Sequence, residues 1–313
     1  CLQSVHYLVL SIKSYSSMQI WRLNINPDSE KSIDPRQFCI ERSIMGFGWP
    51  IHPQSEPVTW EEYEAKAAEK YGSKGWKTAT NGLYKRMRIG DLCWTRDQSG
   101  IYHLGRIESK WRYVDTPDHR KADIVNVRDC QWVQAGEADA APGKVVNSLN
   151  VGGTLQRVNG EAVREYSKSL FNTLGGEDLY DLKGNQQNLF DYLHPDDCED
   201  LVAMYLQTKG YTLFPSTAKV STSMYEYVLK HRETGRKAFV QVKAGNVSLD
   251  ATEFAALDGE VYLFTTRGAQ RGEAPNVQFL SHSELQQFAE ANRHMLPDRI
   301  QAWMDIAQAA DAQ

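Results

Sequence analysis

The stretch KAFVQVKAGN, residues 237–246, alternates apolar and polar side chains with the period of two that is typical of a β-strand. Val240 and Val242 are expected to project to one face of this strand, and Gln241 and Lys243 to the other. An ammonium group that is buried without a partner costs several kcal/mol. Lys243 therefore either reaches solvent at the end of the strand or faces carboxylates in a cleft.

The preceding predicted strand, MYEYVLKH at residues 224–231, contains a charged residue, Glu226, just as the strand at 237–246 contains Lys243. The segment RETGR, residues 232–236, predicts a turn that pairs the two strands. Glu226 can then approach Gln241 and Lys243 across the sheet. The alternative is that Glu226 and Lys243 form an ordinary cross-strand ion pair at a sheet margin.

The segment HPDDCEDLVAMYLQTKGY, residues 194–211, predicts a helix with Pro195 in its first turn and Gly210 at its end. At about 100° per residue, Glu199 lies at the edge of the apolar stripe of this helix, whereas Asp200 points away from it. We therefore expect Glu199 to border the core and Asp200 to face solvent.

The rest of the C-terminal half predicts a strand followed by two helices. The strand is GEVYLFTTRG at 259–268; the helices are ELQQFAEANRHM at 284–295, capped by Ser281 or Ser283, and PDRIQAWMDIAQAA at 297–310. This order of elements describes a compact α/β domain in which helices flank a mixed sheet.

The N-terminal half has a different character, because seven of the eight Trp residues precede residue 135. Short strand candidates, MQIWRLNI at 18–25, DLCWTRD at 91–97 and IYHLGRIES at 101–109, alternate with turn signals. The helix WEEYEAKAAEKYG, residues 60–72, follows Thr59, with Glu62 placed as in a capping box. These elements describe a small, partly closed β-barrel with helices.

The expected class of the whole chain is α+β with two domains. We place the boundary near residues 160–175 and assign 18–165 to the first domain and 166–313 to the second. Because Met18 opens the first clear strand, residues 1–17 are expected to be an upstream extension or a non-native addition.

Composition limits the class of protein. The 313 residues are 41% hydrophobic and 24% charged, which is typical of a soluble globular protein. Five widely spaced Cys residues without a C-x-x-C pair indicate reduced thiols rather than disulfides or a zinc site. Without a membrane-length or signal-like apolar segment, a cytoplasmic protein is expected. A net charge of −5 gives no general attraction for nucleic acid, so such binding requires local basic patches or bound metal.

The motifs EDLV at 199–202, KGY at 209–211, the acid Glu226 and QVK at 241–243 resemble the PD-(D/E)xK nuclease superfamily, and more narrowly its Mrr-like restriction endonuclease branch. The resemblance covers roughly residues 190–290, and Glu226 stands where many relatives have an Asp in a Gly-rich setting. It implies a restriction-endonuclease-like domain with catalytic residues Lys243, Glu226, Gln241 and Glu199. It further implies Mg²⁺, for which Mn²⁺ can substitute, held by Glu226, Gln241, the Val242 carbonyl and Glu199. It also implies a close approach of the nucleic-acid backbone at Gly245.

The segments GFGWP at 46–50 and GDLCWTRDQSGIYHLGRI at 90–107 resemble the PUA superfamily, particularly its EVE-type branch, over residues 18–160. This resemblance implies binding of RNA, or of a modified DNA base flipped into an aromatic pocket. The pocket candidates are Trp21, Trp49, Trp94 and Tyr102. Candidates for phosphate contacts are Lys85, Arg86, Arg88, Arg112, Arg120 and Lys121. The alternative is that the Trp rings are core and the basic residues form a solvated face.

Together the two resemblances imply a modification-dependent DNA endonuclease that serves in restriction and phage defence. Its partner would be double-stranded DNA carrying modified bases. A homodimer follows by analogy, because each nuclease site cuts one strand. The rival is a non-catalytic nucleic-acid-binding protein, with RNA as a candidate target, whose nuclease fold is a scaffold. A third hypothesis is a nuclease recruited by a partner protein, with the first domain as a docking module.

Overall fold

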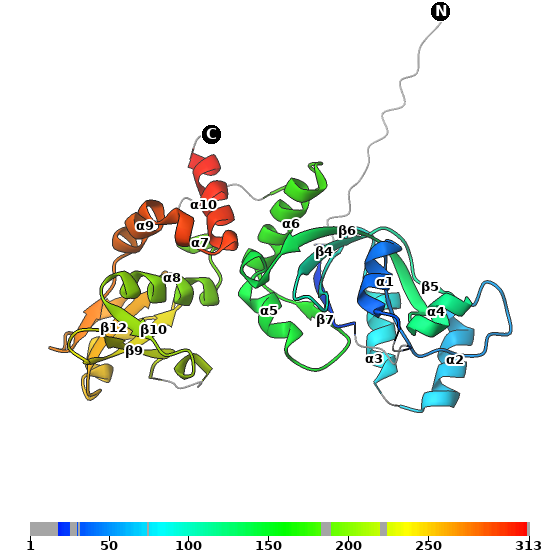
Figure 1. Ribbon diagram of the computed structural model, residues 1–313, viewed down its shortest axis with the longest axis horizontal. Helices are drawn as coiled ribbons and strands as arrows, with labels where there is room; N and C mark the ends of the chain where they lie inside the picture. Colours follow the sequence, from blue (N-terminus) through cyan, green and yellow to red (C-terminus); the bar gives the residue numbers. More distant parts are fainter. Residues whose placement is uncertain are drawn as a thin grey trace, which may run out of the picture.

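The computed structural model describes residues 18–25, 30, 32–73, 75–182, 189–219 and 224–311, so the predicted extension 1–17 lies outside the described residues. The chain is a mixed α and β structure. Figure 1 shows one sheet in the N-terminal half and another in the C-terminal half, with α5, α6 and α10 between them in this view. Among the described residues, no helix is long and apolar enough to cross a membrane.

The N-terminal sheet is curled into a half-barrel around its longest strand, β6. Its order is β2-β6-β4-β3-β1-β7, with β5 also paired to β6. The start of β6 pairs with β2 and β5, and its later part pairs with β4, so this long strand connects β2 and β5 to the rest of the sheet. The strands are β1 (Ile20–Leu23), β2 (Ile44–Phe47), β3 (Leu92–Arg96), β4 (Tyr102–Ile107), β5 (Arg112–Tyr113), β6 (Asn126–Gly136) and β7 (Leu155–Val158). The strand candidates at 91–97 and 101–109 are β3 and β4, which pair antiparallel as a hairpin.

Helical segments interrupt and cover this sheet. They are α1 (Pro35–Glu41), α2 (Trp60–Tyr71), α3 (Trp76–Asn81), the π-helical turn η1 (Gly82–Arg86), α4 (Pro117–Ala122), the 3₁₀ turn η2 (Ala138–Ala140), α5 (Gly143–Leu149) and α6 (Glu161–Gly175). The Thr59 hydroxyl accepts from the Glu62 N–H, which confirms the predicted N-cap of α2. The capping box was wrong, because the Glu62 carboxylate accepts from the Gln54 N–H and the Ser55 hydroxyl instead.

The C-terminal sheet is mixed, as predicted, with the order β14-β12-β10-β9-β8. Strands β10, β12 and β14 are parallel to one another, whereas β9 and β8 run antiparallel to their neighbours. The strands are β8 (Tyr211–Leu213), β9 (Tyr227–His231), β10 (Lys237–Lys243), β12 (Glu260–Thr265) and β14 (Val277–Phe279), beside a separate short pair of β11 (Leu249–Asp250) and β13 (Gln270–Arg271).

The predicted helices of this half are confirmed. Helix α8 begins with Pro195, and α9 is capped by Ser281 rather than Ser283, with Glu284 completing a capping box. The helical segments are α7 (Leu189–Tyr192), α8 (Pro195–Thr208), η3 (Thr217–Lys219), η4 (Ala251–Phe254), α9 (His282–Ala291), η5 (Arg293–Met295) and α10 (Asp298–Asp311).

The two faces of β10 pack differently, as its alternation predicts. Val240 and Val242 join the core cluster that contains Leu201 and Val202 of α8. Phe239 packs on the opposite side, against a smaller cluster around Leu263. Since Gln241 and Lys243 share the face of Phe239, they lie on the side of the sheet away from the body of α8.

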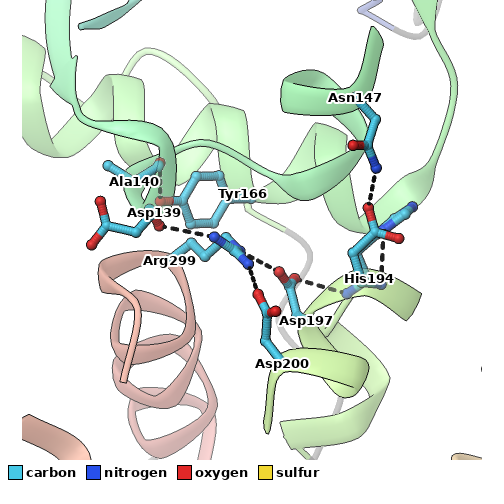
Figure 2. Close-up of polar contacts among 9 residues, drawn as sticks. Asp139, Ala140, Asn147, Tyr166, His194, Asp197, Asp200 and Arg299 are labelled. Atoms are coloured by element: carbon cyan, nitrogen blue, oxygen red, sulfur yellow. Dashed lines mark hydrogen bonds and ion pairs between the residues drawn. The ribbon is translucent and has the colours of Figure 1, made fainter. Parts of the chain in front are cut away.

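Side chains of α10 and α8 join the two halves of the chain. Figure 2 shows the Arg299 guanidinium between Asp197 and Asp200 of α8, with a further hydrogen bond of 3.4 Å to the backbone carbonyl of Asp139. Nearby, the Asn147 side chain of α5 donates to the Asp196 carboxylate at 2.9 Å. These contacts hold the start of α8 against residues of the N-terminal half.

The boundary predicted at residue 165 falls inside α6. Residues on its far side still contact the N-terminal sheet, because the Trp94 indole N–H donates to the Ser167 hydroxyl at 2.9 Å. Farther on, the Tyr180 hydroxyl donates to the Gly90 carbonyl at 2.9 Å. Packing against the first sheet thus continues past the predicted boundary.

Candidate active site

Three of the predicted catalytic side chains meet where β9 and β10 lie side by side. The Lys243 ammonium donates to Oε1 of Glu226 at 2.9 Å, and the Gln241 amide donates to the same oxygen at 3.1 Å. The antiparallel register explains this meeting, since the Glu226 N–H bonds to the Val240 carbonyl at 2.7 Å just before β9 begins. The turn between the strands therefore brings together residues 15 and 17 positions apart, as the sequence predicts.

Gln241 has an unusual environment for an amide. The residue is 1% exposed, and its Oε1 atom is buried without a hydrogen-bond partner among the described residues. Leaving a buried acceptor unpaired costs about 1–3 kcal/mol, and such an orphan in a native structure indicates a water, an ion or a functional role. Amide and carboxylate oxygens are ligands that Mg²⁺ accepts. The donor set of Glu226 and Gln241 therefore fits a hard cation.

The backbone carbonyl of Val242 points toward the same side. Val240 accepts from Glu226 on the β9 side, whereas Lys243 accepts from the Thr266 N–H at 3.0 Å on the β12 side. Because successive carbonyls of a strand alternate in direction, the Val242 carbonyl points with that of Val240 toward the β9 side. It is thus directed toward the side of β10 on which Glu226 bonds to the strand.

Glu199 lies in a second layer, on α8. It is half-buried, and burial raises the pKa of its carboxyl to about 7, with the charges of Glu226, Asp196 and Asp200 adding to the effect and Lys243 opposing it. The Tyr227 hydroxyl donates to the Glu199 backbone carbonyl at 2.9 Å, which ties this point of α8 to the residue after Glu226. Glu199 is coupled to the cluster by charge, without a hydrogen bond to any of its three described side chains.

Glu199 also lines a cleft of about 510 Å³ between α8 and the segment that carries η2 and α5. Asp139, Gly143 and Asn147 line it from the N-terminal half, and Asp196 and Asp200 line it from α8. The prediction for α8 is confirmed in outline, since Glu199 is half-buried and Asp200 is exposed. Asp200 nevertheless has a partner, Arg299, that helical periodicity did not indicate.

Gly245 follows the cluster with a φ of 80°, a conformation that favours glycine. A Cβ atom at this position would meet no atom within 4 Å, so the space beside it is open. Its N–H donates to the Thr266 hydroxyl at 2.7 Å, which holds the turn against the end of β12. The expected open approach at Gly245 is therefore compatible with the backbone there.

In the described part of the chain, no group of three or more His, Cys, Asp or Glu residues could hold a metal ion. The predicted ligand set contains two carboxylates, Glu226 and Glu199, an amide and a backbone carbonyl, so it does not form a group of that kind. The fit to a cation rests instead on the orphaned oxygen of Gln241.

The structure does not bring the four predicted pocket aromatics together in one open site. Trp21, Trp94 and Tyr102 are at most 2% exposed, and Trp21 lies in a different core cluster from the other two. The Trp21 indole donates to the Asp91 carboxylate at 2.8 Å, so its polar edge is satisfied inside the protein. Trp49 is half-buried, with a φ of 63° that is unusual for a residue other than glycine.

A different aromatic cluster contains several rings that the sequence did not single out. Trp60 stacks on Tyr84 with ring centroids 4.1 Å apart and planes 2° apart, and Trp111 packs edge-on against both. Three separate segments contribute these rings: α2, η1 and the residues before β5. The one available signal was the basic run around Tyr84 in YKRMR, residues 84–88.

The predicted phosphate contacts are mostly exposed. Lys85, Arg86 and Arg88 lie on the surface in and after η1. Arg112 is exposed but pairs with Asp129 at 2.6 Å. Two further candidates, Arg120 and Lys121, lie in α4, where Arg120 is half-buried and pairs with Asp115 and Lys121 is exposed.

The comparisons with known proteins assign no activity to this arrangement. A domain of unknown function, DUF8426, matches residues 21–154, which include most of β1, the strands from β2 to β6 and the aromatic cluster. No curated protein and no solved structure matches the chain.

Proposed function

We propose that this chain is a metal-dependent endonuclease of the PD-(D/E)xK type, similar to the Mrr-like branch, in which a PUA/EVE-like N-terminal part reads a modified base. The observation that carries the proposal is the unpartnered, buried oxygen of Gln241 beside the Glu226–Lys243 pair. A purely structural ion pair explains the two charges but leaves that oxygen without a role. A cation bound beside it would satisfy both Gln241 and Glu226.

In this proposal, Mg²⁺ is held by Glu226, Gln241 and the Val242 carbonyl, and Mn²⁺ can substitute for it. Glu199 lies on α8 and acts on this site through its charge. A cation held there would offset charge on the phosphoryl oxygens and would make a water more acidic. Lys243 orients the attacking water and offsets the negative charge that develops at the phosphorus centre. Glu199, whose pKa is raised to about 7, holds or releases a proton near neutral pH on the α8 side.

The N-terminal part supplies recognition in this proposal. Exposed Lys85, Arg86 and Arg88 contact phosphates and fix the register of the duplex, and an aromatic ring receives a base flipped out of the stack. Cutting both strands requires two sites, so the active form is a homodimer on double-stranded DNA. Destruction of foreign DNA that carries modified bases would make the protein part of phage defence.

The test is a cleavage panel of plain, methylated, hydroxymethylated and glucosylated DNA, with RNA as a control, in Mg²⁺ and in Mn²⁺. We expect metal-dependent cleavage of one class of modified duplex. The matched pair of variants is Lys243→Ala and Lys237→Ala, since both lysines lie in β10 but Lys237 is exposed at its far end. Cleavage by Lys243→Ala at the rate of the unaltered protein would overturn the assignment.

The alternative is a non-catalytic nucleic-acid-binding protein, and one observation favours it. Glu226 and Lys243 already neutralise each other at 2.9 Å, so the pair is complete as a structural contact. Calorimetry separates the two functions, because the nuclease requires Mg²⁺ or Mn²⁺ binding that Glu226→Gln abolishes. Absence of binding by the unaltered protein, together with nucleic-acid binding in a chelator, would favour the alternative.

A further inference from the structure

Three aromatic rings in the N-terminal half are arranged as a stack with a perpendicular wall. The planes of Trp60 and Tyr84 are nearly parallel, and the ring centroids are 4.1 Å apart. The Trp111 ring stands at 83° to Trp60 and 82° to Tyr84, with centroid distances of 5.4 and 5.6 Å. Two parallel planes beside a perpendicular one form the geometry in which a flat aromatic ring is held on its face and at its edge.

The two stacked rings differ in how firmly they are held. Trp60 is 5% exposed and packs against Tyr63 within α2. Tyr84 is 37% exposed and belongs to η1, a π-helical turn. Turns of this kind are rare and occur frequently at functional sites. Tyr84 therefore acts as the outer ring, which covers a face of the fixed Trp60.

The inner ring also has an unused donor. The Trp60 indole N–H is buried and has no acceptor among the described residues. A buried indole N–H usually finds a partner, because an unpaired donor is unfavourable. This polar atom is a second feature, independent of the stack, that points to a ligand or water with an acceptor at the edge of Trp60.

Basic residues neighbour the rings of the stack. The Lys85 ammonium lies 5.4 Å from the centroid of the Trp60 ring. Arg86 and Arg88 follow Tyr84 on the surface, and the exposed Lys110 precedes Trp111; Arg112, which follows Trp111, is paired with Asp129. A ligand with a flat ring and attached negative charge fits this combination, and a nucleotide within a DNA strand has both.

We propose that Trp60 and Trp111 form a binding slot for an extrahelical DNA base and that Tyr84 occupies this slot in the unbound protein. On binding, the Tyr84 ring moves outward and the base takes its place on Trp60, while Lys85 and Arg86 contact the adjoining phosphates. The exchange replaces one aromatic stack with another of similar strength, so the base enters at little cost. This inference rests on the proposed reader function and names its site.

The test uses a short DNA duplex with one mismatched 2-aminopurine, whose fluorescence rises when it leaves the stack, in buffer containing a chelator. The mismatch lowers the cost of flipping the base. Glu226→Gln serves as the parent protein so that cleavage does not interfere. We expect binding with a change in 2-aminopurine fluorescence as the base leaves the duplex, and with quenching of tryptophan emission by the base that stacks on Trp60.

Two substitutions of Tyr84 separate this inference from a structural role, because both leave the buried rings intact. Tyr84→Ala empties the slot and is expected to tighten duplex binding about fivefold. Tyr84→Trp covers Trp60 with a larger ring and is expected to weaken binding by a similar factor. Phe214→Ala, which removes an aromatic residue that is 41% exposed in the C-terminal half, is the matched control and leaves affinity unchanged.

Weaker binding by Tyr84→Ala, or equal affinity for both variants, would contradict the proposal that Tyr84 occupies a base-binding slot. Tighter binding of single-stranded RNA than of the duplex would overturn the choice of DNA. The two proposals fail separately in these assays. If cleavage depends on Lys243 but substitution of Tyr84 has no effect, the nuclease proposal stands and the slot proposal fails. If a base binds but no metal-dependent cleavage occurs, the slot proposal stands and the nuclease proposal fails.

Discussion

The ammonium of Lys243 lies 2.9 Å from Oε1 of Glu226, and the amide of Gln241 donates to the same carboxylate oxygen. The side chains of this ion pair are 34% and 23% exposed. Pairs with this degree of solvent contact contribute about 0–1 kcal/mol to stability. The pair is therefore a poor stabiliser of the sheet, and its role in the proposed cleavage can be tested with little interference from unfolding.

Lys243→Met is expected to separate activity from stability. The methionine keeps the length of the aliphatic chain but removes the ammonium, so the free energy of unfolding measured in urea should change by no more than about 1 kcal/mol. Metal-dependent cleavage should fall by roughly 100-fold or more, because the developing negative charge loses its counter-charge. Unfolding curves and single-turnover cleavage check the two parts, and a loss of activity that merely tracks a loss of folded protein would contradict the role.

Gln241→Glu is expected to make stability depend on Mg²⁺. A second carboxylate beside Glu226, at a position that is 1% exposed, should destabilise the metal-free protein by about 2 kcal/mol. Added Mg²⁺ should then raise the melting temperature more than it does for the unaltered protein, since ligand binding stabilises the folded state. Gln278→Glu, at an exposed position of β14, is the control. Equal shifts with Mg²⁺ for all three proteins would argue against a cation at Gln241.

The pKa of Glu199 predicts a defined pH dependence of stability. Burial raises this pKa from 4.5 to about 7, so between these values the folded protein holds a proton that the unfolded chain releases. The corresponding stabilisation is complete below about pH 4.5 and is lost as the pH rises through 7. At pH 8, Glu199→Gln should therefore be more stable than the unaltered protein by on the order of 1 kcal/mol after solvent screening.

This difference should vanish near pH 4, where Glu199 is protonated in both states. Glu253→Gln, which removes an exposed carboxylate, provides the control. Urea titrations of the three proteins at several pH values measure the effect. A difference between Glu199→Gln and the unaltered protein that stays constant from pH 4 to pH 8 would show that burial does not shift this carboxyl.

Arg299 and Arg293 offer a matched comparison of buried and exposed ion pairs. Arg299 pairs with Asp197, and their side chains are 7% and 2% exposed. Arg299→Ala leaves that carboxylate buried and unpaired and should cost about 3–5 kcal/mol. Arg293 pairs with Asp305 at 37% and 61% exposure, so Arg293→Ala should cost about 1 kcal/mol or less. Denaturant unfolding of both variants measures the contrast, and equal losses would mean that burial of the Asp197 pair has no energetic effect.

Local patterns predicted much of the C-terminal half. The alternation at residues 237–243 determined which side chains of β10 enter the core, and the turn at 232–236 determined that Glu226 would meet Gln241 and Lys243. Helical periodicity placed Glu199 at the margin of the core. These inferences depend on residues close together in the chain, where backbone geometry alone decides which side chains share a face.

Such patterns could not predict contacts between segments that are far apart in the chain. Arg299 and Asp197 are 102 positions apart, so no periodicity relates them. The stack of Trp60 on Tyr84, with Trp111 beside it, depends on how α2, η1 and the residues before β5 pack. The sequence also could not show that Trp94 and Tyr102 are buried while Tyr84 is exposed. An aromatic residue near a small curled sheet can lie either in the core or on the surface, and its residue type does not decide between them.

The sequence by itself thus determined a mixed sheet with polar side chains at one face of β10, a helix that carries Glu199, and an N-terminal half of short strands and helices. The tertiary structure alone decided that the Gln241 oxygen is left without a partner and that the Glu199 carboxyl has a raised pKa. The physical reason is that the alternation of residues along a strand sets the direction in which each side chain points. The burial, hydrogen bonding and charge environment of a side chain depend instead on which atoms from distant parts of the chain surround it.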